Sequence, residues 1–339
     1  MDSPATTESK DRFEPHRWLR TGHLQTLAGN FLKRENRLPA AEERLFQVEP
    51  EVQVLCHCHW QPEAVRRQTM TVIIVHGLEG SSESQYVIGT GSKAWALGWN
   101  VVRMNIRNCG GTEHLAPTLY HSGLSGDIRA VILALIEQDH LERIGVAGFS
   151  MGGNQVLKCV GEWGNDAPKE LVGAVGVSPA ADLSLSADAI HRLSNRMYEW
   201  WFLVGLRQRL RRKAELFPGR FDTSLLKKAN SIRTFDEYIT AKYMGFESAE
   251  DYYSKASSSR VLDRIMVPTL VIHADDDPFI KLSAATMAKL EANPKIRFLR
   301  TAHGGHCAFV GRQNGDDGRW AEGRIIEFLK QRRQAVGRK

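Results

Sequence analysis

The chain has 339 residues, of which 42% are hydrophobic and 25% charged, so it can bury a substantial core and is not a disordered protein. Its net charge of +6 is a mild basic excess. No zinc-finger spacing, aromatic RNA-binding box or heptad repeat accompanies that charge, so no nucleic-acid partner is expected. Five scattered cysteines, an odd number, indicate free thiols in a reducing compartment.

The amino-terminal segment lacks the basic and apolar regions of a signal peptide. No run of 18 uncharged apolar residues occurs, so no transmembrane segment is expected. These two observations predict a cytoplasmic protein.

Residues 1–40 are polar and without periodicity, and we expect them to wrap irregularly around the core. Strand candidates follow at residues 44–48 and 52–60. The second contains the run Cys56, His57, Cys58 and His59, which looks like a metal cluster. Successive side chains of a strand point to opposite faces, so these four cannot converge on one ion. We therefore read the run as a strand, and no metal or cofactor is expected.

From residue 70 onward, short β-branched apolar runs alternate with amphipathic helical patterns. Such continuous apolar runs are typical of parallel strands buried on both faces. The pattern predicts an α/β fold with a mainly parallel eight-stranded sheet flanked by helices, formed by residues 41–180 and 264–339. The later strand candidates are residues 72–75, 101–104, 144–147, 172–177, 270–272 and 296–299.

The alternation breaks between residues 181 and 263, which carry helical patterns, aromatics and arginines and are expected to form an inserted helical lid. Its apolar run 200–206 is followed by a basic cluster of Arg207, Arg209, Arg211, Arg212 and Lys213. This arrangement suits an interfacial helix in weak peripheral contact with anionic lipid. We favour a helix that packs its aromatic side chains on the core and leaves the basic end solvated.

The sequence Gly148-Phe149-Ser150-Met151-Gly152 fits the G-x-S-x-G pattern between a strand and a helix. This context is that of a nucleophile elbow, a strained turn that lifts the serine hydroxyl above the sheet. Ser150 is therefore the candidate nucleophile. The amide of Met151, at the start of the helix, is a candidate oxyanion donor. A chance glycine-rich turn is the alternative explanation.

A serine on a nucleophile elbow acts with a histidine as general base and an acid that orients the histidine, and both follow the serine along the chain, the acid first. Asp275, Asp276 and Asp277 follow a strand and compete for the acid, with a solvated helix-capping turn as the alternative explanation for the first two. His303 and His306 flank a Gly-Gly turn and compete for the general base; a strand-end surface position is the favoured explanation for His303.

The segment His76-Gly77-Leu78-Glu79-Gly80 follows the first central strand. In this fold an amide of that loop pairs with the amide after the nucleophile, and we assign it to Leu78. The glycines allow a substrate carbonyl to approach the backbone closely.

These pieces resemble the YheT-like branch of α/β hydrolases, family four of the superfamily, over about residues 17–330. The stretches that carry the resemblance are GHLQT (22–26), HGLEGSS (76–82), MNIRNCGG (104–111), YHSGLSGD (120–127), GFSMGGN (148–154), FDEY (235–238), GFESAEDYY (245–253), DDPF (276–279) and GGH (304–306). One departure is Asn108, where the family usually has glycine.

The resemblance implies that Asp277 is the acid and His306 the base. It also implies a carboxylesterase- or lipase-like serine hydrolase acting on small-molecule acyl esters, with medium or long chains, in lipid metabolism. Relatives of this kind include enzymes that also transfer acyl groups to alcohols. Two alternatives therefore stay open: alcohol O-acyltransfer by the same residues, and a catalytically silent binding member of the fold.

Overall fold

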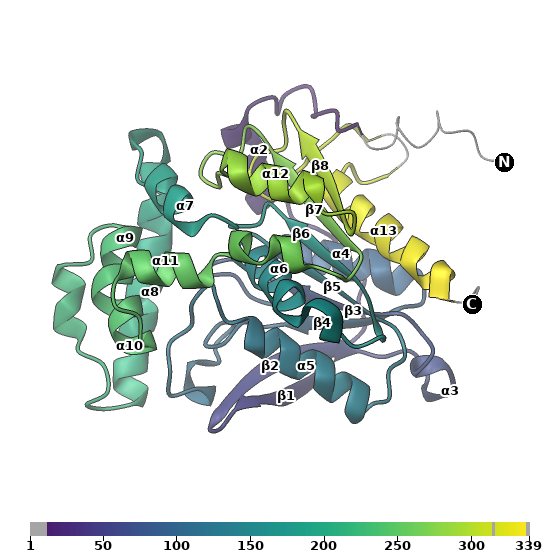
Figure 1. Ribbon diagram of the computed structural model, residues 1–339, viewed down its shortest axis with the longest axis horizontal. Coiled ribbons are helices and arrows are strands. Elements are labelled where there is room, and N and C mark those ends of the chain that lie inside the picture. Colours follow the sequence, from purple (N-terminus) through teal and green to yellow (C-terminus); the bar gives the residue numbers. More distant parts are fainter. Residues whose placement is uncertain (1–11, 314–315, 337–339) are drawn as a thin grey trace.

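The computed structural model describes residues 12–313 and 316–336 and contains one eight-stranded sheet in the order β1-β2-β4-β3-β5-β6-β7-β8 (Figure 1). β1 pairs antiparallel with β2, and β2 pairs antiparallel with β4. The other six strands, β3 to β8, all run parallel to one another. The predicted α/β class and mainly parallel sheet are confirmed. The strands are β1 (Glu42–Glu49), β2 (Val52–His59), β3 (Thr71–Val75), β4 (Asn100–Met104), β5 (Ile144–Phe149), β6 (Leu171–Val177), β7 (Thr269–Ala274) and β8 (Ile296–Thr301).

Helices cover both faces of the sheet, because its strands alternate apolar side chains between two cores. On β3, Ile73 and Val75 join the core under α5 and α6, whereas Val72 and Ile74 join the core under α4 and α13. Every residue of β3 to β7 is buried as a result. The flanking helices are α4 (Gln85–Ala96), α5 (Ser125–Glu137), α6 (Met151–Trp163), α12 (Ala284–Ala292) and α13 (Trp320–Val336); short α3 (Glu63–Arg66), η1 (Glu113–Leu115) and η2 (Gly164–Asp166) lie in connections.

The run 56–59 lies in β2, as predicted. Cys56 and Cys58 are buried in the core beside α5, while the ring of His57 contacts the Ser82 hydroxyl at 2.9 Å on the other face. Among the described residues no cluster of His, Cys, Asp or Glu has the arrangement of a metal site.

The amino-terminal segment is less irregular than expected. Residues 1–11 lie outside the described part, but Gly22–Phe31 forms helix α2. The Thr21 hydroxyl caps it by accepting the amide of Leu24. The expectation of an irregular wrap is wrong for these residues. The segment has too few apolar residues to show a helical pattern, and its helix is held by polar contacts to the carboxyl-terminal loops.

Between β6 and β7 the chain leaves the sheet and forms only helices, at the left of Figure 1. We call residues 183–264 the helical insertion. It consists of α7 (Leu183–Ile190), η3 (Leu193–Asn195), α8 (Arg196–Leu216), η4 (Thr223–Lys227), α9 (Ile232–Phe235), the π-helical η5 (Asp236–Ala241), α10 (Lys242–Met244), α11 (Ala249–Ala256), η6 (Ser258–Arg260) and η7 (Leu262–Arg264).

Helix α8 contradicts the favoured interpretation of its side chains. Trp200 and Trp201 are 63% and 61% exposed rather than packed on the core. Conversely, Lys213 is fully buried and Arg209 is largely buried, so the basic end is only partly solvated. The sequence pattern misled because polar partners on the core satisfy these cations in the interior.

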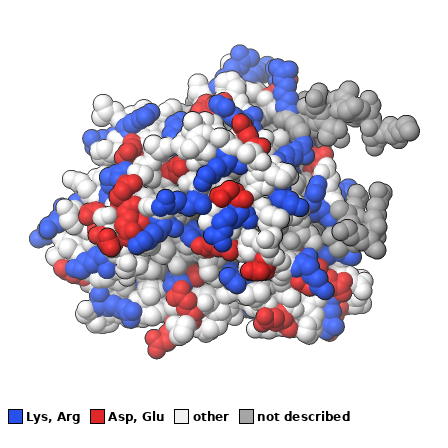
Figure 2. Space-filling view, viewed as in Figure 1, with Lys and Arg blue, Asp and Glu red and all other residues white. Residues whose placement is uncertain are grey.

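Basic and acidic side chains are interspersed over the face drawn in Figure 2, so the net charge is not gathered into one basic field there. No helix of the described chain is both long and apolar enough to cross a membrane.

Candidate active site

Ser150 occupies a sharp turn between β5 and α6, with φ 55° and ψ −118°. The neighbouring glycines are required sterically. A Cβ on Gly148 would lie 2.2 Å from the Gly152 carbonyl oxygen, and one on Gly152 would lie 2.3 Å from the His76 carbonyl oxygen. The strained conformation is the one expected of a nucleophile elbow, in which backbone strain presents a hydroxyl at the carboxyl edge of the sheet.

The turn after β3 faces the elbow. His76 fixes it from within: its Nδ1 lies 2.7 Å from the Gly77 carbonyl oxygen, and its Nε2 accepts the Ile106 amide. Burial lowers the pKa of His76 to about 4, so this ring is a neutral structural link. The amides of Leu78 and Met151 donate no hydrogen bond to any described group, which leaves both available to an incoming oxygen atom.

Asp277 and His306 form a direct pair, with 2.8 Å between Oδ2 and Nδ1. The other carboxylate oxygen accepts the amides of Phe279 and Ile280. Burial raises the pKa of Asp277, but the charge and hydrogen bond of His306 outweigh it and hold the pKa below the ordinary value. Burial lowers the pKa of His306, but the contacts with Cys307 and Asp277 outweigh burial, so the pKa of His306 is raised.

The competing residues have other partners. Asp275 forms a half-exposed ion pair with Arg300. Asp276 contacts His303 at 3.2 Å and accepts the Gly305 amide, so it orders the turn that carries His306. Neither aspartate contacts His306.

Helix α2 supplies residues that sequence reasoning left without a role. Thr26 accepts the His306 amide at 2.9 Å, and Gln25 exchanges hydrogen bonds with the backbone of Val310. Gly22 allows the close approach, because a Cβ there would lie 1.8 Å from the Asp276 carbonyl oxygen. The GHLQT stretch was the only signal that could have indicated this support.

Ser150 and His306 line the same cavity of about 530 Å³, which we call the mouth cavity. Among the described atoms no hydrogen bond joins the two side chains. The Nε2 atom of His306 lies 3.7 Å from the Cys307 sulfur instead. Cys307 and Phe309 have positive φ, so the turn that follows His306 is strained.

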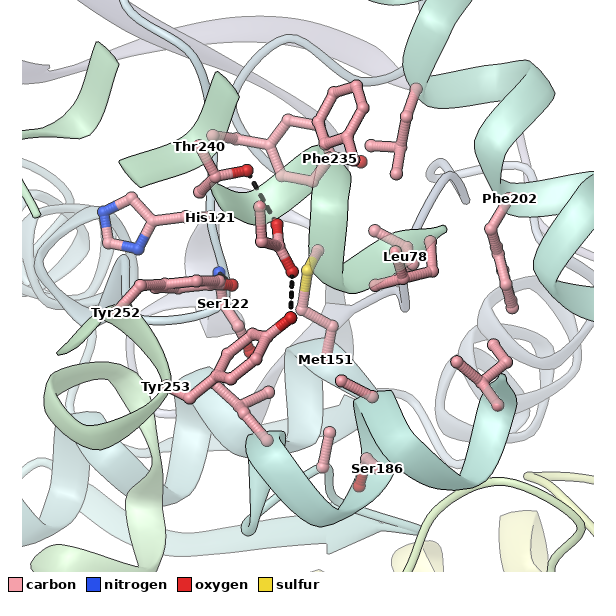
Figure 3. A pocket seen from close by; sticks show the side chains of 18 of the residues that line it. Leu78, His121, Ser122, Met151, Ser186, Phe202, Phe235, Thr240, Tyr252 and Tyr253 are labelled. Carbon is pink, nitrogen blue, oxygen red and sulfur yellow. Dashed lines mark hydrogen bonds between the residues drawn. The ribbon is translucent and has the colours of Figure 1, made fainter. Parts of the chain in front are cut away.

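A second cavity of about 130 Å³ lies between Ser150 and the helical insertion, and we call it the insertion chamber. Leu78, Ser150, Phe202 and Phe279 line both cavities, so the serine stands where they meet. Figure 3 shows Leu78 and Phe202 on one side of the chamber and His121, Thr240 and Tyr252 on the other. Most of its lining is apolar.

The fold and the elbow define an α/β hydrolase, and the family model for the α/β hydrolase fold matches residues 71–313. The chain belongs to this family. Within it, the chain belongs to the YheT-like branch: it is 32% identical to the putative esterase YheT of Escherichia coli over 95% of this chain and 94% of that protein.

Other relatives match at lower identity or coverage. The mouse protein named phospholipase ABHD3 is 28% identical over 71% of this chain and 58% of its own length. The yeast medium-chain fatty acid ethyl ester synthase/esterase 2 is 31% identical over 76% of this chain and 61% of its own length.

Solved structures agree on the fold. The Pyrococcus furiosus esterase Pf2001 superposes with a TM-score of 0.57 at 18% identity, covering 86% of this chain and 92% of that one. Est1E from Butyrivibrio proteoclasticus gives 0.53 at 16% identity, with 86% and 98% covered.

Proposed function

We propose that this esterase-type α/β hydrolase cleaves carboxylic esters through a Ser150–His306–Asp277 triad and an acyl-enzyme. His306 takes the Ser150 proton as the oxygen attacks the ester carbonyl, and the oxyanion rests on the amides of Leu78 and Met151. The proton passes to the leaving alcohol. Water, activated by the same histidine, then releases the acid and restores the serine.

One observation carries the proposal: the strained Ser150 and the loop of Leu78 line the cavity that also holds the histidine of a buried Asp277–His306 pair. The amide of Leu78 and that of Met151, which lines the adjoining insertion chamber, are both without a described acceptor. The carboxylate fixes the tautomer with a proton on Nδ1, which leaves Nε2 to accept the serine proton. A small movement of the histidine loop is required to bring Nε2 from the sulfur of Cys307 to the serine oxygen.

The cavity sizes support an assignment of the two halves of the ester. A cavity of about 150 Å³ lined by apolar side chains accommodates benzene, so the 130 Å³ insertion chamber suits an acyl chain of about six carbons. The mouth cavity, at about 530 Å³, suits a larger alcohol or head group. Medium-chain acyl esters are therefore the proposed substrates.

The decisive experiment is a series of p-nitrophenyl esters from acetate to palmitate, assayed with the wild-type protein and Ser150→Ala. We expect a maximum near hexanoate that is lost in the variant. Labelling by a fluorophosphonate probe should likewise require Ser150. A folded wild-type protein that neither labels nor turns over any ester would mean a catalytically silent member of the fold.

Transfer of the acyl group to an alcohol is the second candidate, favoured by the 31% identity to a yeast protein named as both synthase and esterase. In this reaction an alcohol replaces water at the acyl-enzyme. Adding ethanol to the hexanoate assay separates the two: ethyl hexanoate accumulates if transfer competes, whereas hexanoic acid alone indicates hydrolysis.

Contact with lipid surfaces is supported by an exposed apolar rim around the mouth cavity. Phe31, Met197 and Trp201 line this cavity and are 67%, 56% and 61% exposed, and Trp200 beside them is 63% exposed. Exposed aromatic groups at a cavity mouth are typical of interfacial attachment.

Flotation with vesicles that contain anionic phospholipid tests this contact. The double variant Trp200→Gln/Trp201→Gln should lose binding, whereas Leu45→Gln, which removes a 47% exposed apolar group from β1, should not. Equal flotation of all three proteins would remove the lipid contact from the proposal.

A further inference from the structure

Glu79, directly after the proposed oxyanion donor Leu78, has an unusual environment. Its φ is 55°, a left-handed conformation that is unfavourable for a residue with a Cβ. Its side chain is only 9% exposed although it is a carboxylate. A strained backbone and a buried charge at the same residue require compensating contacts, because neither persists without them.

Arg209 of helix α8 supplies those contacts. Its Nε and Nη2 atoms lie 3.0 Å and 3.1 Å from the two oxygens of the Glu79 carboxylate, a bidentate pair. Tyr120 donates a further hydrogen bond to Glu79 at 2.5 Å. Gly205 lets α8 approach this closely, since a Cβ there would lie 2.4 Å from a Glu79 oxygen.

The same face of α8 also holds the neighbouring loop after β4. Arg209 donates to the Asn108 carbonyl oxygen and to Glu113, and Lys213 donates to the Asn108 side chain at 3.2 Å. Asn108, which departs from the family pattern, has a φ of 64°. Two left-handed residues in two separate loops are thus bound to one helix of the insertion.

We propose that Arg209 is a positioning residue that, by clamping Glu79, holds the Leu78 amide in line with the oxyanion that forms on the ester carbonyl when Ser150 attacks it. This inference rests on the proposed function. The oxyanion site is then complete only when α8 is docked, so the insertion contributes to the rate as well as to substrate fit. Arg209 does not touch the reacting atoms; it acts on the Leu78 amide through the backbone of residue 79.

The alternative is a purely structural role, in which the ion pair only fastens α8 to the core. The two roles differ in what they change. A fastening role lowers thermal stability and leaves kcat intact in protein that remains folded. A positioning role lowers kcat for every ester, including one too short to occupy the insertion chamber, with little change in KM.

The test compares Arg209→Met, Arg209→Lys and Glu79→Gln with Arg212→Met on p-nitrophenyl acetate. Arg212 is the matched control, because its pair with Glu215 lies on the same helix and is exposed at both ends. We expect Arg209→Met and Glu79→Gln to lower kcat about 10- to 100-fold, less than the loss of a whole oxyanion donor. Arg209→Lys should recover part, since lysine keeps the charge without the bidentate geometry.

Amide hydrogen exchange of residues 77–80 supplies a readout that does not depend on turnover. The clamp predicts faster exchange there in Arg209→Met than in Arg212→Met. If the wild-type protein hydrolyses no ester but this difference appears, the proposed function fails and the clamp stands. If Arg209→Met and Glu79→Gln keep the wild-type kcat, or if exchange at 77–80 is unchanged, the clamp is overturned. If Arg209→Met does not fold, the kcat of Glu79→Gln and its exchange at residues 77–80 decide the question, because this substitution preserves the shape of the side chain.

Discussion

The sheet and the helical insertion contribute to this site in opposite ways. In the sheet, apolar strands are buried and the polar residues of the site stand in the turns at their carboxyl ends. In the insertion, α8 buries Glu199 and Lys213 against the protein and exposes Trp200 and Trp201. The hydrophobic pattern therefore locates strands well, whereas an inserted helix is oriented by the polar partners it meets.

The two regions also have separate tasks. Turns at strand ends hold the proposed reacting groups, so changes there should affect every ester. Side chains of the insertion line the chamber, so changes there should depend on the acyl chain, apart from the clamp formed by Arg209. Substitutions in the two regions should therefore differ both in the size of their effect and in its dependence on the ester.

Replacement of the proposed base should give the largest loss. His306→Asn removes the proton acceptor, and we expect kcat to fall by at least about 10⁴-fold for all esters. The rival His303→Asn removes only a half-exposed contact with Asp276 and should change kcat by less than about twofold. Steady-state kinetics of both variants decide between the histidines; equal losses would refute the assignment.

The elbow should be intolerant of a methyl group. Gly152→Ala places a Cβ 2.3 Å from the His76 carbonyl oxygen and should cost at least about 2 kcal/mol of unfolding free energy. Gly126 is the second residue of α5, as Gly152 is of α6, but it has open space around it. Gly126→Ala should therefore stabilise the folded protein by about 0.5–1 kcal/mol. Urea denaturation midpoints measure both, and equal shifts would show that the close packing of the elbow is unimportant.

Filling the insertion chamber should alter chain-length preference alone. Ala187 lines the chamber, and Ala187→Leu should lower kcat/KM for p-nitrophenyl hexanoate about tenfold while acetate is unaffected. Ala288→Leu, at an exposed position of α12, is the control. A parallel loss on acetate would mean that the chamber does not hold the acyl chain.

The smallest effect concerns pH. Contact with Cys307 helps to raise the pKa of His306, and the base must be neutral to act, so kcat/KM should rise with pH through a value above the ordinary histidine pKa. Cys307→Ala should move this acidic limb to lower pH by up to about one unit. Cys159→Ala, buried in α6, should leave the limb in place. A pH profile from 5 to 10 distinguishes the variants.

Most of the sheet and the local shape of the elbow could be predicted from sequence. Strand candidates at 72–75, 144–147 and 270–272 fall within β3, β5 and β7, because continuous β-branched runs have few alternatives in a chain of this kind. Helix α2 could not be found in this way, since it is fixed by contacts of Gln25 and Thr26 to residues about 280 positions away.

The assignment of the acid shows the same limit. Spacing alone left three consecutive aspartates in competition, and the preference for Asp277 depended partly on a family resemblance. In the folded chain only Asp277 contacts His306, while Asp276 orders the turn beside it.

The amino-acid sequence was sufficient to predict the parallel sheet, the strained serine turn and the order of the candidate residues, because these follow from local patterns of apolar runs and glycines. The folded chain was needed to show which aspartate meets His306, why α8 turns Arg209 and Lys213 inward, and how α2 supports the histidine turn. These features depend on buried polar groups, which must find partners, and those partners lie far away along the chain.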